Sequence, residues 1–268
     1  YVAKHFPADA KAKMDQLVEN LRKAYGERIK ALTWMSEDTK TVALEKLAAF
    51  RPKIGYPSKW RSYQGLEVKP GEAFANLQRA NAHEWQYDVE KLGKPSDREI
   101  WAMTPQTVNA YYNSTFNEIV FPAAILQAPF FDPNADPAVN YGAIGGVIGH
   151  EMGHGFDDQG AKSDAKGVLR TWWKKEDEEA FAKLTSGLAD QYAAFEPLPG
   201  LKINGRLTLG ENIGDLGGLS VAREAYLLSL DGKPAPVIDE VTGDQRFFYG
   251  WAQVWRSNIR DQALRNQI

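Results

Sequence analysis

Five residues near the middle of the chain, His150-Glu151-Met152-Gly153-His154, follow the pattern His-Glu-x-x-His. On a helix, residues four apart lie on one face, so both imidazoles can reach a single metal ion. Glu151 stands beside the first histidine, where it can take a proton from a zinc-bound water. The chain has no cysteine and only four histidines, so any metal must be held by His, Asp or Glu. The pattern therefore predicts the zinc site of a hydrolase.

A catalytic zinc usually has three protein ligands and one open position, so a third ligand is needed. Glu211 lies in a stretch of small and apolar residues, Gly210 to Leu219, and a buried acid requires a metal or another partner. Glu176 is the alternative, but it lies in a charge-dense segment that is typical of an exposed helix start. We therefore expect Glu211 to be the third ligand.

Two further acids are placed to orient these ligands. Asp157 follows His154 by one helical turn, and Asp215 follows Glu211 by one turn. A metal-bound histidine usually donates its second ring N–H to a carboxylate, which fixes the ring. We expect Asp157 and Asp215 to take this role.

Hydrophobic spacing predicts a mostly helical α+β fold with a small antiparallel sheet. Two short strands are expected, Thr107–Tyr112 and Glu118–Phe121, with a hairpin loop at residues 113–117. Prolines at positions 52 and 57 should end the second of the helices. Helices are expected at about residues 7–32, 36–50, 72–92, 141–156, 172–195, 208–230 and 243–259.

The bulk properties exclude several classes of partner. The 268 residues carry a net charge of -3 and no basic block, which argues against binding to nucleic acid or to anionic membranes. No segment reaches the roughly 20 apolar residues that span a bilayer. The compartment stays open: we expect an extracytoplasmic location, in a bacterial periplasm or cell envelope, with the cytoplasm as the alternative.

The chain resembles the neprilysin and endothelin-converting enzyme family of zinc metallopeptidases, and a bacterial oligopeptidase within it. The likeness extends over essentially the whole chain, and the motifs are family-specific in combination. Four blocks carry it: Val108–Tyr112, Ile119–Gln127, Val147–Gly160 (VIGHEMGHGFDDQG) and Leu209–Leu219 (LGENIGDLGGL).

The resemblance implies a thermolysin-like (gluzincin) catalytic domain with one Zn²⁺ per chain, which cleaves oligopeptides on the amino side of large hydrophobic residues. Glu151 matches the catalytic base that activates the zinc-bound water, and Asp215 and Asp157 match acids that support the site. The matched zinc ligands are His150, His154 and Glu211, and the strand that binds the substrate backbone is matched by Asn109 and Ala110. The pocket for the residue after the scissile bond is matched by Ile125, Phe130, Val147, Val254 and Trp255, for which plain core packing is the competing interpretation.

The resemblance also implies that residues 1–268 form one incomplete peptidase domain. Residues 1–100 would be a helical lead-in, and residues 101–268 would hold the edge hairpin, the zinc-site helices and the C-terminal helix. Family members carry a helical roof domain and, beyond the block that includes Trp255, a histidine that stabilises the transition state. We expect both to lie in the rest of a longer chain, so that this segment alone binds zinc but is a poor peptidase.

Three other hypotheses remain at this point. The first is a single-domain thermolysin or aminopeptidase relative with Glu176 as a ligand. The second is a peptide-binding protein without turnover, against which the intact Glu151 argues, because a binder needs no base. The third is a purely structural zinc site, which two histidines, one acid and flanking glycines fit less well than an open catalytic site.

Overall fold

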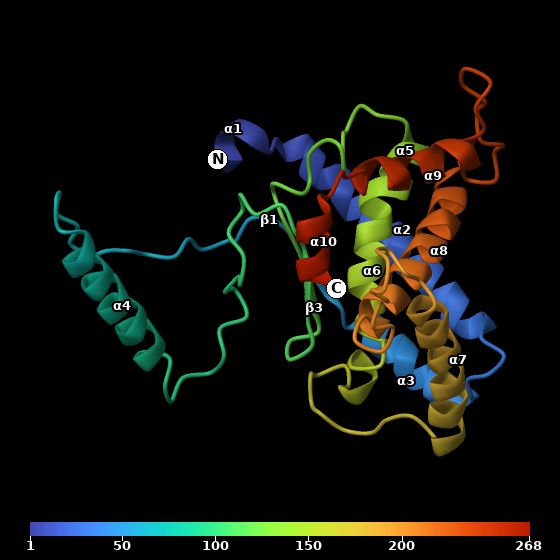
Figure 1. Ribbon diagram of the computed structural model, residues 1–268, viewed down its shortest axis with the longest axis horizontal. Coiled ribbons are helices and arrows are strands. Elements are labelled where there is room, and N and C mark those ends of the chain that lie inside the picture. Colours follow the sequence, from blue (N-terminus) through green and yellow to red (C-terminus); the bar gives the residue numbers. More distant parts are fainter. The chain divides into compact units, whose positions relative to one another are not determined.

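The computed structural model describes residues 1–268, except for the side chains of residues 8 and 9. Helices dominate and a three-stranded sheet is present, so the mostly helical α+β class is confirmed (Figure 1). In chain order the elements are α1 (Val2–His5), α2 (Ala8–Ala31), α3 (Glu37–Ala48), β1 (Arg51–Gly55), α4 (Ala73–Val89), β2 (Tyr111–Asn113), β3 (Glu118–Pro122), α5 (Pro137–Asn140), the π-helix η1 (Tyr141–Gly145), α6 (Gly146–Gly153), the 3-10 helix η2 (Gly160–Lys162), α7 (Lys175–Ala193), α8 (Leu209–Ser229), α9 (Gly243–Val254) and α10 (Asp261–Gln267).

The chain divides into two compact units. The larger unit combines residues Tyr1–Tyr56 with Met103–Ile268, so the N-terminal helices belong to the same body as the candidate metal site. The smaller unit is Pro57–Ala102, and α4 is its helix. The lead-in expected over residues 1–100 is therefore shared between the two units.

The longest helix, α2, forms where the sequence places apolar residues three and four apart. Those residues, Met14, Leu17, Val18, Leu21, Ala24, Tyr25 and Ile29, are all buried in the core of the larger unit. In the next helix, α3, the hydroxyl of Ser36 accepts a hydrogen bond from the N–H of Thr39, as expected for an N-cap. No helix in the described part of the chain, α2 included, is both long and apolar enough to span a membrane.

The sheet is mixed, so the expectation of an antiparallel sheet was wrong in part. Its strand order is β1-β3-β2: β2 pairs with β3 antiparallel, and β1 pairs with β3 parallel. Pro52 was expected only to end a helix, but a proline is also tolerated in an edge strand such as β1. Lys53 of β1 reaches Glu118 of β3 in a buried ion pair of 2.7 Å. The partner of β1 lies more than 60 positions away in sequence, so the residues around β1 do not indicate that it pairs with β3.

Several element boundaries also differ from the expected ones. Asn109 and Ala110 precede β2 and are not part of the strand. The helix expected over residues 141–156 begins as the π-helix η1, continues as α6 and ends at Gly153. α9 ends at Val254, and α10 was not expected because its short polar sequence has no apolar periodicity.

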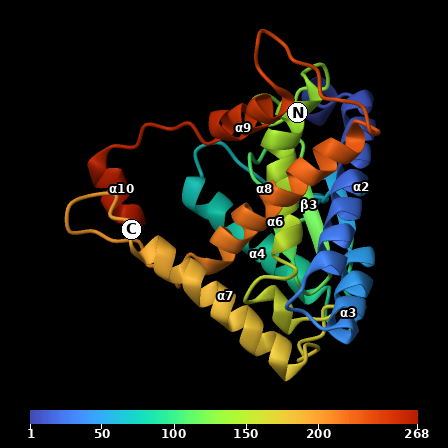
Figure 2. The same cartoon turned by 90° about the vertical axis from the view of Figure 1, so that its right-hand side faces the viewer.

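The helices α6 and α8 cross with their backbones in direct contact, and α2 lies alongside them (Figures 1 and 2). Glycines make this approach possible. A Cβ atom on Gly149 would lie 2.5 Å from the carbonyl oxygen of Gly218, and one on Gly218 would lie 2.3 Å from the backbone nitrogen of His150. One turn earlier on α8, a Cβ on Gly214 would lie 2.8 Å from Nδ1 of His150. The crossing therefore sets the distance between the histidines of α6 and the acids of α8.

Gly218→Ala should force the two helices apart. We expect a loss of about 1–3 kcal/mol in the free energy of unfolding, the usual cost of overpacking a core, together with weaker metal binding. Gly187→Ala is the matched control, because Gly187 lies in α7 with no atom within 4 Å of its added Cβ. That change should stabilise the helix by up to about 1 kcal/mol. Denaturant unfolding of the two variants measures the difference, and equal free energies would contradict the steric argument.

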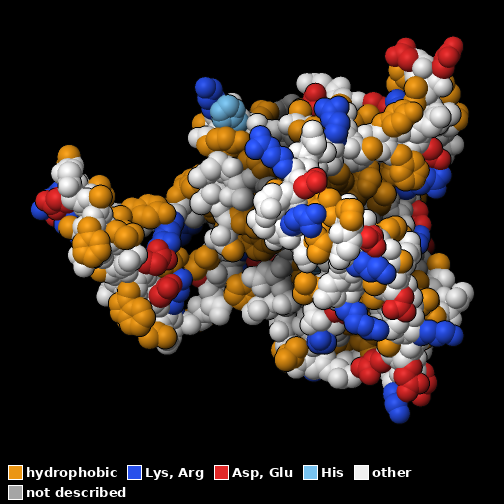
Figure 3. All heavy atoms as spheres, viewed as in Figure 1, with side chains coloured by type: hydrophobic (Ala, Val, Ile, Leu, Met, Phe, Trp, Pro, Cys, Tyr) orange, Lys and Arg blue, Asp and Glu red, His pale blue; other side chains and the backbone are white. Residues whose placement is uncertain are grey.

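The surface of the molecule mixes charges of both signs. On the face drawn in Figure 3, basic and acidic side chains are interspersed. This agrees with the net charge of -3 and leaves no extended field of one sign on that face.

Candidate metal centre

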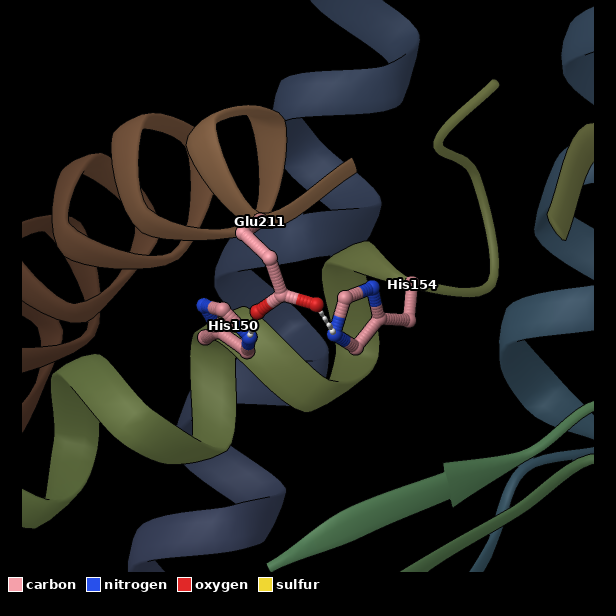
Figure 4. A group of neighbouring side chains, drawn as sticks. All are labelled: His150, His154 and Glu211. Atoms are coloured by element: carbon pink, nitrogen blue, oxygen red, sulfur yellow. Dashed lines mark ion pairs between the residues drawn. The ribbon is translucent and has the colours of Figure 1, made fainter. Parts of the chain in front are cut away.

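The two histidines of the His-Glu-x-x-His pattern lie on one face at the C-terminal end of α6 (Figure 4). His150 lies within the helix, and His154 is its C-cap residue. Their ring centroids are 4.5 Å apart and the ring planes are nearly perpendicular, at 87°. The rings therefore converge toward a common point without stacking on each other.

Glu211, in the first turn of α8, points at the same place (Figure 4). Its carboxylate oxygens lie 3.2 Å from Nε2 of His150 and 3.8 Å from Nε2 of His154. The three candidate ligand atoms all fall within 4.8 Å of one another. Ligands at roughly 2.0–2.1 Å from a tetrahedral zinc ion are about 3.3 Å apart, so this donor set fits zinc.

The premise that led to Glu211 was wrong in one respect. Its side chain is 69% exposed, not buried, because the small residues around it pack the helix crossing and leave the carboxylate open to solvent. The alternative ligand, Glu176, is an exposed residue in the first turn of α7 and is not part of the group of convergent ligand atoms.

Asp215 and Asp157 bind the opposite ring nitrogens. Nδ1 of His150 is 2.8 Å from Oδ1 of Asp215, and Nδ1 of His154 is 2.8 Å from Oδ2 of Asp157. Each carboxylate accepts a hydrogen bond from Nδ1–H, so each neutral imidazole presents the lone pair of Nε2 to the site. Both acids thus lie where the sequence analysis expected them.

The acids also hold protons on the rings when no cation is bound. Burial disfavours the charged form of His150, but hydrogen bonds to Asp215 and Glu211 outweigh it and raise the pKa to about 10. The pKa of His154 is also raised: burial lowers it, but the hydrogen bond to Asp157 and the negative charges of Glu151 and Asp157 together outweigh burial. A metal must displace these protons, so its binding releases protons and weakens as the pH falls.

Glu151 is buried beside the two rings on α6. Burial raises the pKa of its carboxyl to about 7, against the lowering effect of His150 and His154. The backbone N–H of Tyr112 in β2 faces this carboxylate and also lowers its pKa. A group with a pKa near neutrality can both accept and return a proton under physiological conditions.

The residues expected to bind a substrate backbone, Asn109 and Ala110, come just before β2, the strand that contacts this glutamate. β2 is at an edge of the sheet, and Tyr112 of β2 contacts Glu151. Just before β2, Ala110 is buried and Asn109 is exposed, with Oδ1 of Asn109 accepting the N–H of Ala110 at 2.9 Å. Tyr112 was not among the site residues predicted from the sequence. It contacts Glu151 through its backbone, which every residue type possesses, so the residue type at position 112 does not indicate the contact.

The five apolar residues expected to line a pocket divide into two groups. Ile125 and Val147 lie in the buried core, with the partly buried Phe130 packed against it, and packing alone accounts for their burial. Val254 is half-buried at the end of α9, and Trp255 is 55% exposed.

Two contacts bring these groups to the start of α6. The carbonyl of Phe130 accepts the N–H of Ile144, and the ring of Trp251 covers Gly146, one residue before Val147. Trp251 was missed in the sequence analysis, although it lies one turn before Trp255 and stacks edge-on against it at 5.5 Å.

Comparison with known proteins identifies the family. Two models described as peptidase family M13 match residues 1–57 and 109–268. The chain belongs to peptidase family M13. Human endothelin-converting enzyme 1 is 41% identical over 96% of this M13 chain, and an endothelin-converting enzyme homologue of Locusta migratoria is 39% identical over all of it.

Solved structures give the same result. The zinc metalloprotease Zmp1 of Mycobacterium tuberculosis, in complex with an inhibitor, is 55% identical and superposes over 97% of the chain with a TM-score of 0.94. PepO from Lactobacillus rhamnosis is 35% identical over 97% of the chain, with a TM-score of 0.87. The resemblance to the neprilysin and endothelin-converting enzyme family is thereby confirmed.

This M13 chain is much shorter than its relatives. It spans 34% of the human enzyme, 38% of the locust homologue and 40% of each of the two solved chains.

Proposed function

We propose that this chain carries the catalytic centre of a zinc metalloendopeptidase that cleaves oligopeptides on the amino side of large hydrophobic residues. The observation that carries the proposal is the convergence of two imidazole Nε2 atoms and one carboxylate beside a separate, buried glutamate. A structural zinc site has no use for the additional acid, whereas hydrolysis requires one.

The residues that fit the metal are His150, His154 and Glu211. A zinc ion held there would polarise the scissile carbonyl and acidify the attacking water. Glu151 accepts the proton from that water and returns it to the leaving amine, for which a pKa near 7 is suited. Asp215 and Asp157 keep Nε2 of both rings directed at the site.

We propose that the substrate backbone lies along Asn109, Ala110 and the strand β2 that follows them. An extended peptide can add to an edge strand of a sheet through its backbone N–H and C=O groups, and β2 is such an edge strand. Oδ1 of Asn109 is occupied by Ala110, which leaves its Nδ2 group to donate to a substrate carbonyl.

The preference for a hydrophobic residue after the scissile bond rests on the apolar side chains near the start of α6. Val147 belongs to the first turn of this helix, and Ile125 and Phe130 lie in or against the same apolar core. The end of α9, which carries Val254 and Trp255, reaches the helix where the ring of Trp251 covers Gly146. A large apolar side chain gains about 25 cal/mol for each Å² that it buries against such residues.

The test is peptide cleavage by the full-length protein, with the products mapped by mass spectrometry. Matched peptides that differ only in the residue after the scissile bond, Phe, Leu, Ala or Glu, should be cleaved fastest with Phe or Leu. A chelator should abolish cleavage and zinc should restore it. Equal cleavage rates for the four peptides would contradict the proposed specificity. Cleavage by the zinc-free protein would contradict the proposed mechanism.

Asn109→Ala should weaken substrate binding and leave the metal in place. The loss of one hydrogen bond to the substrate backbone should lower kcat/KM by about 10-fold, equivalent to about 1.4 kcal/mol. Steady-state kinetics with the fastest peptide, together with the zinc content, measures the effect.

Two variants sharpen this test. Asn109→Asp keeps the acceptor for Ala110 but has no donor amide, so it should be as impaired as the alanine variant. Gln106→Ala changes an exposed residue three positions upstream and should cleave normally. Full activity of Asn109→Asp would show that Asn109 acts only on its own backbone.

A further inference from the structure

A lysine on α3 is buried next to the metal centre. Lys46 is fully buried, with 0% of its surface exposed. Its Nζ donates to the carbonyl oxygens of Gly160 and Ser163, both at 2.7 Å, and lies 5.8 Å from the ring centres of Phe156 and Trp172. A buried ammonium group is costly unless its donors are satisfied, so these carbonyls are held firmly by the cation.

The anchored carbonyls belong to the loop that follows the second histidine. The N–H of Gly160 donates to Oδ1 of Asp157 at 2.6 Å, and the N–H of Gln159 donates to the same oxygen at 2.8 Å. The other oxygen of Asp157 holds Nδ1 of His154 at 2.8 Å. A single residue, Gly160, therefore separates the ammonium of Lys46 from the carboxylate that orients His154.

The backbone of Lys46 is hydrogen-bonded to the hairpin that β2 and β3 form. Its carbonyl accepts the side-chain N–H of Asn117 at 3.0 Å, and Asn117 is buried in a left-handed conformation with φ 52°. Oδ1 of Asn117 accepts the hydroxyl of Tyr112 at 2.9 Å. The backbone N–H of Tyr112 in turn faces the carboxylate of Glu151.

We propose that Lys46 is a positioning residue that fixes both His154, through Asp157, and the β2 edge beside Glu151. The chain of contacts runs from the base to the metal ligand without passing along α6. Lys46 thus sets the spacing between the two groups independently of the helix that carries both. This inference rests on the proposed zinc site.

The test is a double-mutant cycle in the full-length protein, with zinc affinity measured by competition against a chelator. Lys46→Met keeps the apolar stem and removes the donors. We expect it to weaken zinc binding roughly 10–100-fold, as does the loss of other groups that orient a ligand, and Asp157→Ala to do the same. If Lys46 acts through Asp157, the double variant should bind zinc within about 3-fold of Asp157→Ala, because coupled residues are not additive.

Lys40→Met is the matched control. Lys40 lies on the same helix, is 8% exposed, and donates to the carbonyl of Lys30 and to Glu37, away from the metal centre. Its loss should lower thermal stability without changing zinc affinity. If Lys46→Met does not fold, Lys46→Gln, which retains one donor group, takes its place and should show a smaller loss of affinity.

Two results would overturn the inference: wild-type zinc affinity in the folded Lys46 variant, or losses that multiply in the double variant. A failure of the zinc site itself is recognised separately. In that case the wild type would bind zinc no better than His150→Ala, whatever residue 46 is.

Discussion

Glu151→Gln should lower the turnover of peptide at least about 100-fold while the zinc content stays unchanged. Glutamine has nearly the shape of glutamate and can still accept the N–H of Tyr112. It cannot take a proton from water, so the variant loses the base alone. The measurement is kcat on the fastest peptide, together with elemental analysis of the same preparation.

The control for this change is Glu45→Gln, which alters an exposed glutamate on α3. It should be indistinguishable from the wild type. Near-normal cleavage by a homogeneous Glu151→Gln preparation would refute the role of Glu151. A loss of zinc along with activity would instead show that residue 151 supports the metal.

Periodic patterns and caps made the helices predictable. The apolar spacing from Met14 to Ile29 and the Ser36 cap gave α2 and α3 to within about a turn. Thr242 was not considered, yet it forms a capping box with Gln245 and begins α9 at the expected Gly243. Such signals are local, so they are readable from sequence alone.

Contacts between distant segments were not predictable in the same way. β1 pairs with β3 across more than 60 positions, and no residue in Arg51–Gly55 indicates its partner. The contacts of Lys46 depend on carbonyl groups of residues 160 and 163, which every residue type possesses. A lysine near the end of a helix is ordinarily expected at the surface, so its burial had no signal.

The metal centre was readable because its chemistry restricts residue types. A pair of histidines four apart, a third acid and two further carboxylates fit these restrictions, and those residues do converge. The exposure of Glu211 could not be predicted from the sequence. The neighbouring glycines suggested a buried segment, but they allow the close contact between α6 and α8 and do not cover Glu211.

The exposed position of Glu211 makes its removal a clean test of the ligand set. Because its side chain is 69% exposed, Glu211→Ala opens no cavity in the core and should leave the fold intact. We expect zinc affinity to fall by more than the roughly 10–100-fold that follows the loss of an orienting group. The measured fall will understate the contribution of the ligand. Without Glu211, the pKa of His150 drops, so the metal has a less tightly held proton to displace.

Two matched variants turn this expectation into a ranking. Asp215→Ala removes an acid that only orients His150, so its zinc affinity should lie between those of the wild type and Glu211→Ala. Glu176→Ala removes an exposed acid in the first turn of α7 and should bind zinc like the wild type. Competition against a chelator of known affinity measures all three. Undiminished zinc in Glu211→Ala would remove that residue from the ligand set, and a loss in Glu176→Ala would revive the alternative ligand. The ranking discriminates because each change removes one negative charge from the protein, so a difference among the three variants reports the position of the carboxylate and not the net charge.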